Sequence, residues 1–95
     1  MSSYELVLVI NPEVADEDVP GAAEKVSELI AKVGGSVTEI TQWGRKRLAY
    51  PIRRFKEGSY VLTRFEIEPA LTKELDMKLR SPEEILRHLL IKLRD

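Results

Sequence analysis

The stretch SYVLTRFEIE, residues 59–68, alternates strictly along its length, and this alternation sets the fold class of the chain. One face would carry Val61, Thr63, Phe65 and Ile67, and the other Tyr60, Leu62, Arg64 and Glu66. A period of two residues predicts a β-strand. The segment before it, Ser36 to Ile52, also reads as a long strand, and Phe55-Lys56-Glu57-Gly58 supplies a turn. Two strands joined by a short Gly-containing turn predict an antiparallel hairpin.

Two features lie on the amino-terminal side of this hairpin. Tyr4 to Ile10 (YELVLVI) is apolar on both faces, which predicts a central strand. A helical pattern from Val19 to Val33 follows the acidic run Asp16-Glu17-Asp18, which suits the first turn of a helix because acids oppose its positive dipole end. Gly34-Gly35 ends the helix. Val37 and Ile40 are out of phase, so a bulge is expected between them.

Two further elements follow the hairpin. Leu71, Leu75 and Leu79 form the apolar stripe of a short second helix, and the stretch from Leu86 to Leu93 closes the chain. Its length favours a strand, although its leucine-rich composition would also suit a helix. The order β-α-β-β-α-β predicts an α+β, ferredoxin-like (split βαβ) fold, with two helices on one face of a four-stranded antiparallel sheet. At 95 residues, we expect a single domain spanning residues 1–95.

Charge is unevenly distributed along the chain. Residues 1–44 carry a net charge of −6, residues 45–56 carry six bases and no acid, and the remainder is near balance. Such a basic island is typical of proteins that meet phosphates or an acidic partner. No apolar run reaches the roughly 18 residues that span a bilayer, and cysteine is absent. We therefore expect a cytoplasmic protein without membrane association.

The sequence lacks the residue patterns of an active site. There is one histidine, His88, with no Gly-rich phosphate loop, no metal-spaced ligand set and no Ser-centred elbow. A lone histidine in a terminal strand is usually structural, and if functional it would contact a phosphate or base. Acylphosphatases share this topology but hold phosphate in the loop after the first strand, which here is the acidic segment 11–18. We expect no catalysis, cofactor, metal or small-molecule substrate.

RNA recognition motifs also share the topology, but the match is weak. Their third strand needs a basic residue, a glycine and an aromatic in succession. This chain has Glu57-Gly58-Ser59-Tyr60, with the charge inverted and the aromatic displaced.

The basic stretch interleaves its charges with aromatic and apolar residues. By strand alternation, Arg45, Arg47 and Ala49 would share one side, and Lys46, Leu48 and Tyr50 the other. Charges on an edge strand can simply discourage aggregation. Six bases without an acid exceed that need and repel one another, so the composition favours binding of a polyanion.

The same residues resemble the bacterial small-subunit ribosomal protein S6 family. The resemblance runs along the whole chain and includes Asn11-Pro12, Trp43-Gly44-Arg45-Lys46-Arg47-Leu48-Ala49-Tyr50-Pro51-Ile52, Glu57-Gly58-Ser59-Tyr60 and Ile85-Leu86-Arg87-His88. It departs at Ser81-Pro82, which occupies a turn where other residues are commoner. It also ends at Asp95, without the acidic tail of some members.

The resemblance implies a ferredoxin-like protein of the small ribosomal subunit. Such a protein pairs with ribosomal protein S18 and binds the central domain of small-subunit ribosomal RNA during assembly. The residues implied in contacts with RNA or partner are Arg45, Lys46, Arg47, Tyr50, Arg53, Arg54, Lys56, Tyr60, Arg80 and Arg87, to which the chemistry of its ring adds His88. The alternative is a ferredoxin-like protein-interaction or metabolite-sensing module without RNA.

Overall fold

The structure is a computed structural model that describes residues 1–94. Its elements are β1 (Ser2–Ile10), a 3₁₀ turn (Asp16–Asp18), α1 (Val19–Val33), β2 (Ser36–Ile52), β3 (Phe55–Ile67), a second 3₁₀ turn (Pro69–Leu71), α2 (Thr72–Lys78) and β4 (Ile85–Arg94). The predicted order β-α-β-β-α-β is confirmed, and the closing segment is a strand.

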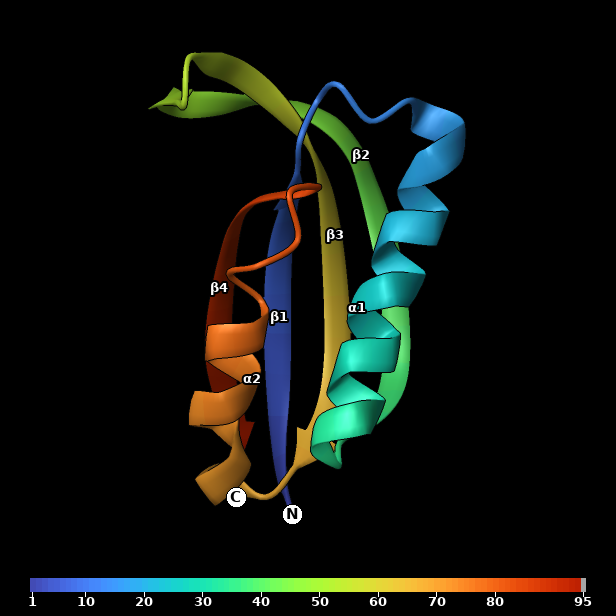
Figure 1. Cartoon of the computed structure of the whole chain (residues 1–95), viewed down its shortest axis with the longest axis vertical. Coiled ribbons are helices and arrows are strands. Elements are labelled where there is room, and N and C mark those ends of the chain that lie inside the picture. The colour runs from blue at the N-terminus through green and yellow to red at the C-terminus, as the bar shows by residue number, and fades with distance from the viewer. Residues whose placement is uncertain (95) are drawn as a thin grey trace.

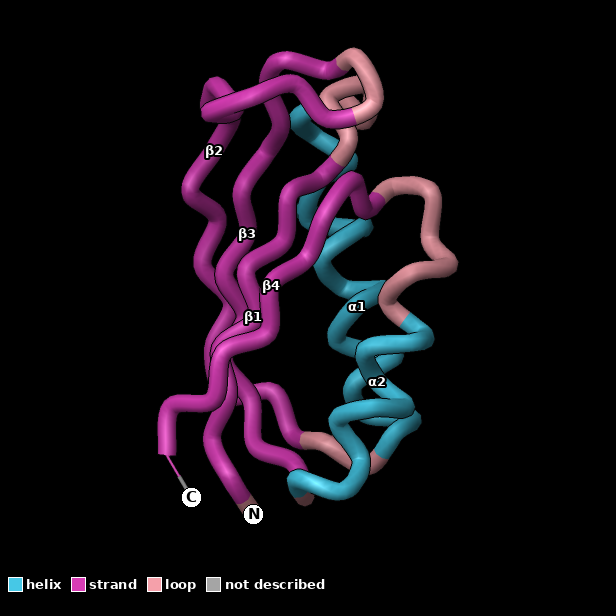
Figure 2. The backbone as a smooth tube through the Cα atoms, turned by 90° about the vertical axis from the view of Figure 1, so that its left-hand side faces the viewer, coloured by secondary structure: helices cyan, strands magenta, loops and turns pink. Residues whose placement is uncertain are grey.

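The four strands form one antiparallel sheet in the order β2-β3-β1-β4. Both helices cover the same face, and Figure 2 shows the sheet and the helices as two separate layers. The other face of the sheet has no helix over it (Figures 1 and 2). The predicted α+β, ferredoxin-like arrangement is therefore confirmed, including the central position of β1.

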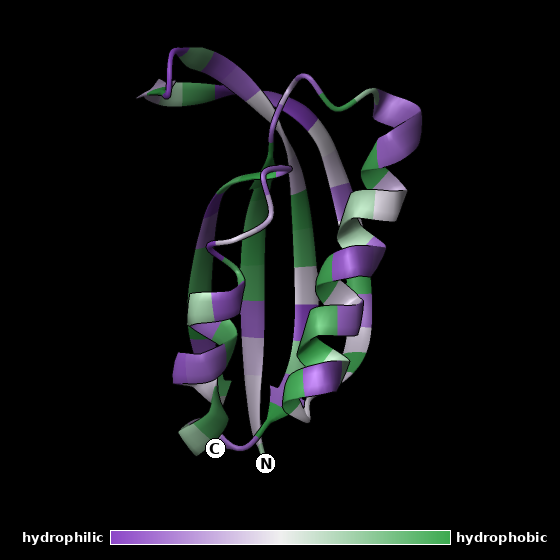
Figure 3. Cartoon of the chain, in the orientation of Figure 1, coloured by the Kyte–Doolittle hydropathy of each residue, from purple (hydrophilic) through white to green (hydrophobic). Residues whose placement is uncertain are grey.

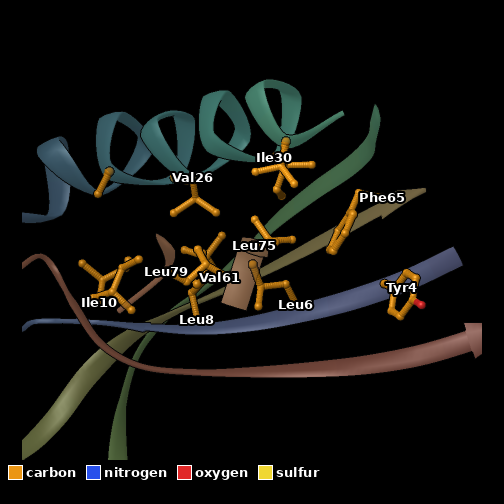
Figure 4. Packing of buried hydrophobic residues seen from close by; sticks show 14 of the residues in the cluster. Tyr4, Leu6, Leu8, Ile10, Val26, Ile30, Val61, Phe65, Leu75 and Leu79 are labelled. Carbon is orange, nitrogen blue, oxygen red and sulfur yellow. The ribbon is translucent and has the colours of Figure 1, made fainter. Parts of the chain in front are cut away.

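The core lies between the sheet and the helices. Alternate residues of β1, from Tyr4 to Ile10, point into this layer together with Val61 and Phe65 of β3, and Val26 and Ile30 of α1 meet them from above (Figure 4). Tyr4 and Phe65 stack with ring centroids 5.8 Å apart. Apolar residues line the inner sides of both layers, whereas the outer turns of α1 are largely hydrophilic (Figure 3). Burial of this stripe is what holds a helix of ordinary propensity on the sheet.

The ends of α1 follow its sequence signals with one difference. Gly34 adopts φ +105°, and its N–H and that of Gly35 are donated to the carbonyls of Ala31 and Ile30. This left-handed cap is a conformation that glycine adopts without strain. The acidic run Asp16–Asp18 does not form the first turn of α1. It forms a separate 3₁₀ turn ahead of the helix, and α1 begins at Val19 with Pro20 in its first turn, where proline is well tolerated.

The β2–β3 hairpin confirms the predicted bulge but not the predicted turn. The register shifts between Val37 and Glu39, and Ile52 pairs with Phe55, so the turn is Arg53-Arg54. Gly58 lies inside β3, where an added Cβ would sit 2.6 Å from Cγ1 of Val9 and 3.1 Å from the carbonyl oxygen of Ile10. The turn prediction from Phe55 to Gly58 was wrong because Gly58 permits close packing against β1 and makes no turn.

Candidate nucleic-acid interface

The six clustered bases lie on the far end of the β2–β3 hairpin, which we call the basic arm (residues 45–56). The arm extends past the helix-covered part of the sheet and bends over the start of β4 (Figure 1). None of its residues is buried, and only Leu48, Ile52 and Phe55 are half-buried. All six basic residues therefore lie at the surface.

Arg45 is the base of the arm that the protein itself neutralises. Its Nη2 lies 3.2 Å from Oδ1 of Asp16, and its Nη1 lies 3.2 Å from Oε1 of Glu57 and donates to the carbonyl of Pro12 at 3.1 Å. The hydrogen bond to Asp16 is the main reason that the pKa of Arg45 is raised above its ordinary value. Arg45 thus ties the root of the arm to the loop before α1.

The other five bases of the arm have no acidic partner. Within residues 1–94, no ion pair or hydrogen bond involves the side chains of Lys46, Arg47, Arg53, Arg54 or Lys56. Five exposed cations on one short hairpin create a positive potential that a nearby polyanion would relieve. The sequence predicted the cluster, and the structure separates its five free members from Arg45.

The tip of the arm is a two-residue turn whose backbone conformation is unfavourable for the arginines that form it. Arg53 has φ 48° and Arg54 has φ 73°, so both occupy the left-handed region. Two-residue hairpin turns of this kind strongly prefer Asn-Gly or Asp-Gly, because other side chains are strained there. Strain of this type is concentrated at functional sites. Two guanidinium groups are held at the tip despite the conformational cost.

Tyr50 connects the arm to β4. Nη1 of Arg87 donates a hydrogen bond of 2.5 Å to the hydroxyl of Tyr50, and the guanidinium lies 5.9 Å from the centre of the Tyr50 ring. The contact joins residues 37 positions apart in sequence. It fixes the direction in which the arm leans and places Arg87 beside the arm's bases.

Arg80 and His88 meet at one carboxylate on α2. Nη2 of Arg80 lies 3.0 Å from Oδ2 of Asp76, and Nε2 of His88 lies 2.7 Å from Oδ1 of the same residue. The His88 hydrogen bond is the largest cause that lowers the pKa of Asp76. The side chain of His88 is only 14% exposed and faces α2. The structure therefore sets His88 apart from the free bases of the arm.

The open face of the sheet carries an apolar strip that sequence reasoning did not single out. Leu89 is 53% exposed and Ile91 is 38% exposed, and in the strand register Leu89 pairs with Val7 and Ile91 with Glu5. Tyr60 and Arg87 border a hollow of about 180 Å³ in the same strip. The available signal was the apolar run Leu89-Leu90-Ile91 in β4, because a strand with one helix-covered face turns every second residue outward.

Two kinds of site are not found in the part of the chain that the structure describes. No group of three or more histidine, cysteine, aspartate or glutamate side chains is placed to hold a metal ion among residues 1–94. Across the same residues, no helix is long and apolar enough to cross a membrane.

A small ferredoxin-like fold with five bases that have no acidic partner among residues 1–94, and with an apolar strip on its open sheet face, is typical of binding proteins. The family model described as ribosomal protein S6 matches residues 3–92. The chain therefore belongs to the ribosomal protein S6 family, as the sequence resemblance predicted. It is a protein of the small ribosomal subunit and not an enzyme.

Individual relatives agree with this assignment. The small ribosomal subunit protein bS6 of Moorella thermoacetica is 40% identical over 95 residues, covering 100% of this chain and 97% of the relative. The protein of the same name from Desulforamulus reducens is 41% identical over 92 residues, with 97% of each chain covered. The crystal structure of 30S ribosomal protein S6 from Thermotoga maritima superposes with a TM-score of 0.88 at 28% identity, over 97% of this chain and 87% of that one.

Proposed function

We propose that this protein binds the central domain of small-subunit ribosomal RNA together with ribosomal protein S18, and that the pair supports subunit assembly and translation in the cytoplasm. One observation carries the proposal. In a member of a ribosomal protein family, five exposed bases of the arm lack any acidic partner within the described residues. Phosphate is the abundant anion of a ribosome, and neutralised phosphates release counterions, which favours binding.

The mechanism is positioning of the protein on the RNA backbone. Lysine and arginine side chains contact phosphates and fix the register, but they carry no sequence information. The major groove of an RNA helix is too deep and narrow for side chains to read. Specificity must then come from the shape of the RNA and from the protein partner. The free bases are spread along the arm, with Arg47 on β2, Arg54 in the turn and Lys56 on β3, so the arm can contact more than one phosphate.

The open sheet face supports the proposed partnership with S18. Leu89, Ile91 and Val7 form an apolar strip that no helix covers, and Arg87 borders it at the arm. An exposed apolar strip with a charged rim is typical of a protein–protein contact. The proposal thus assigns the free bases chiefly to RNA and the sheet face to the partner protein.

The decisive experiment removes two free bases from the arm and measures RNA affinity and its salt dependence. The control removes two bases from the surface of the helices. Arg47→Ala/Arg54→Ala should weaken binding of central-domain RNA in the presence of S18. It should also flatten the dependence of log affinity on log salt by about 0.7 to 0.9 per lost phosphate contact. Lys32→Ala/Lys73→Ala removes the same charge from exposed sites on the two helices and should change both quantities little. Filter binding at four or more salt concentrations measures both.

The result that would overturn the proposal is equal behaviour of the two double variants. Sedimentation gives an independent check against a protein-interaction or metabolite-sensing module without RNA. Native protein should cofractionate with small ribosomal subunits, whereas recovery only as a free homodimer would support the rival.

A further inference from the structure

Three arginines from separate parts of the chain meet around one hollow of about 250 Å³. Arg53 comes from the tip of the basic arm, Arg80 lies just beyond α2, and Arg87 is on β4. Leu79 and Ile85, which belong to the core, also line the hollow. We propose that this hollow binds one phosphate group of the RNA backbone, an inference that rests on the proposed RNA-binding function.

The guanidinium groups keep hydrogen-bonding capacity for a ligand. Arg53 has no partner within residues 1–94. Arg80 uses only Nη2, on Asp76, and Arg87 uses only Nη1, on Tyr50. A guanidinium has five N–H donors, so each arginine retains most of its donors. Three arginines from separate elements around one hollow suit the tetrahedral oxygens of a phosphate better than they suit a flat carboxylate.

The acidic groups near the hollow do not cancel its charge. Asp76 contacts two of the lining residues, and both of its oxygens are already engaged, one by Arg80 and one by His88. Glu84 points away to Nζ of Lys25 at 2.6 Å, and Glu83 is not among the lining residues. Three cations against one carboxylate leave the hollow with net positive charge, before any charge on His88 is counted.

The position of the arm decides whether the hollow is complete. Arg80 and Arg87 lie close together in the sequence, but Arg53 reaches them only because the arm leans over β4 (Figure 1). The contact between Tyr50 and Arg87 holds that lean and orients the Arg87 guanidinium. Tyr50 is therefore a positioning residue for the phosphate site. Tyr50→Phe should weaken the site while every charge is kept.

Inorganic phosphate is the first probe. Nitrogen-15 spectra of the arginine Nε–H groups should be recorded as phosphate replaces chloride at constant ionic strength. Arg53, Arg80 and Arg87 should shift along saturating curves, whereas Arg47 and Arg54, which lie outside the hollow, should drift linearly. Arg80→Gln should abolish saturation at Arg53 and Arg87 while the backbone spectrum stays folded. Absence of saturation, or equal curves at all five arginines, would overturn the site.

RNA binding then tests the source of the phosphate. Arg80→Gln should lower the affinity for central-domain RNA and reduce the salt slope by about one phosphate contact. If phosphate saturates the hollow but this variant binds RNA as the wild type does, the RNA assignment is wrong. The result is distinguishable from failure of the proposed function. If Arg47→Ala/Arg54→Ala binds RNA as the wild type does, the proposed RNA-binding function of the arm is refuted. If that variant binds RNA more weakly but the phosphate titration fails, only the phosphate site in the hollow is refuted.

Discussion

The two ends of the β2–β3 hairpin lie in opposite surroundings. At the sheet end, Val61, Phe65 and Ile67 of β3 are almost completely buried against the helices. At the arm end, residues 45–56 have no buried member and carry six bases. The comparison teaches that one hairpin can serve two purposes. Its sheet end, where buried and exposed residues alternate along β3, defines the fold, and its arm end presents charge.

The two ends also differ in how well each residue suits its local conformation. The sheet end satisfies pattern, register and packing together, which is typical of segments that specify a fold. The arm end places arginines in a left-handed turn and crowds like charges. Natural proteins break local rules of this kind mainly at functional sites. The difference predicts that substitutions will change stability at one end and binding at the other.

The largest expected effect comes from truncating an aromatic residue at each end. Phe65→Ala removes a ring that is 1% exposed and should lower the free energy of unfolding by about 3–5 kcal/mol. Tyr50→Ala removes a ring that is 57% exposed and should cost about 1 kcal/mol or less. Urea denaturation of both variants measures the contrast. Similar losses at the two positions would show that the arm contributes to the core after all.

A smaller effect of opposite sign is expected at the turn. Arg53→Asn/Arg54→Gly supplies the residues that a two-residue turn with positive φ prefers, so the free energy of unfolding should rise by about 1 kcal/mol or more. Binding of central-domain RNA should weaken in the same variant, because two free bases are lost. Urea denaturation and filter binding measure the two changes on one protein.

A matched variant separates the conformational gain from the removal of charge. Lys46→Asn/Arg47→Gln removes the same number of charges from the arm without altering the turn. It should weaken RNA binding but gain less stability than the turn variant. Equal gains in the two variants would assign the stabilisation to relief of charge repulsion and would refute the strain at Arg53 and Arg54.

Most of the fold could be predicted from local pattern. A run that is apolar on both faces predicted β1, and alternation predicted β3. The apolar stripe and Gly34 predicted α1, and the phase error between Val37 and Ile40 predicted the bulge. The turn could not be found in this way, because Gly58 is a turn residue by composition but a packing residue by position. Its contact with Val9 depends on a strand 49 positions earlier, which no local pattern reports.

The sequence could predict which bases make up the candidate site, but not which of them are paired with acidic residues. Charge counting identified the basic arm, but only the tertiary structure shows that Arg45 is neutralised by Asp16, 29 positions away, while Arg47 is not. His88 was expected to be structural more often than functional, but the sequence did not reveal its partner, Asp76. The grouping of Arg53 with Arg80 and Arg87 depends on the lean of the arm toward β4, where Tyr50 contacts Arg87, and no local pattern reports this contact.

The smallest expected effect concerns Asp76, the partner of His88, and the loss of stability at acidic pH. The pKa of Asp76 is lowered in the folded protein, first by the hydrogen bond of His88 and also by Arg80. A group with a lowered folded pKa binds more protons when unfolded, so its stabilisation is present above the unfolded pKa of about 3.9 and disappears as pH falls through the folded value. Asp76→Asn should therefore be less stable than wild type near neutral pH, and the gap should close below about pH 4.

Urea midpoints between pH 5.5 and pH 2.5 measure this closing gap. Glu83→Gln is the matched control, because Glu83 is exposed and has no ion pair within residues 1–94. At each pH, the stability of each variant is first compared with that of the wild type. The difference for Glu83→Gln is then subtracted from the difference for Asp76→Asn. A difference that stays constant across the range would mean that Asp76 stabilises the protein by neutral hydrogen bonding. It would then do no more than hold His88 in place against α2.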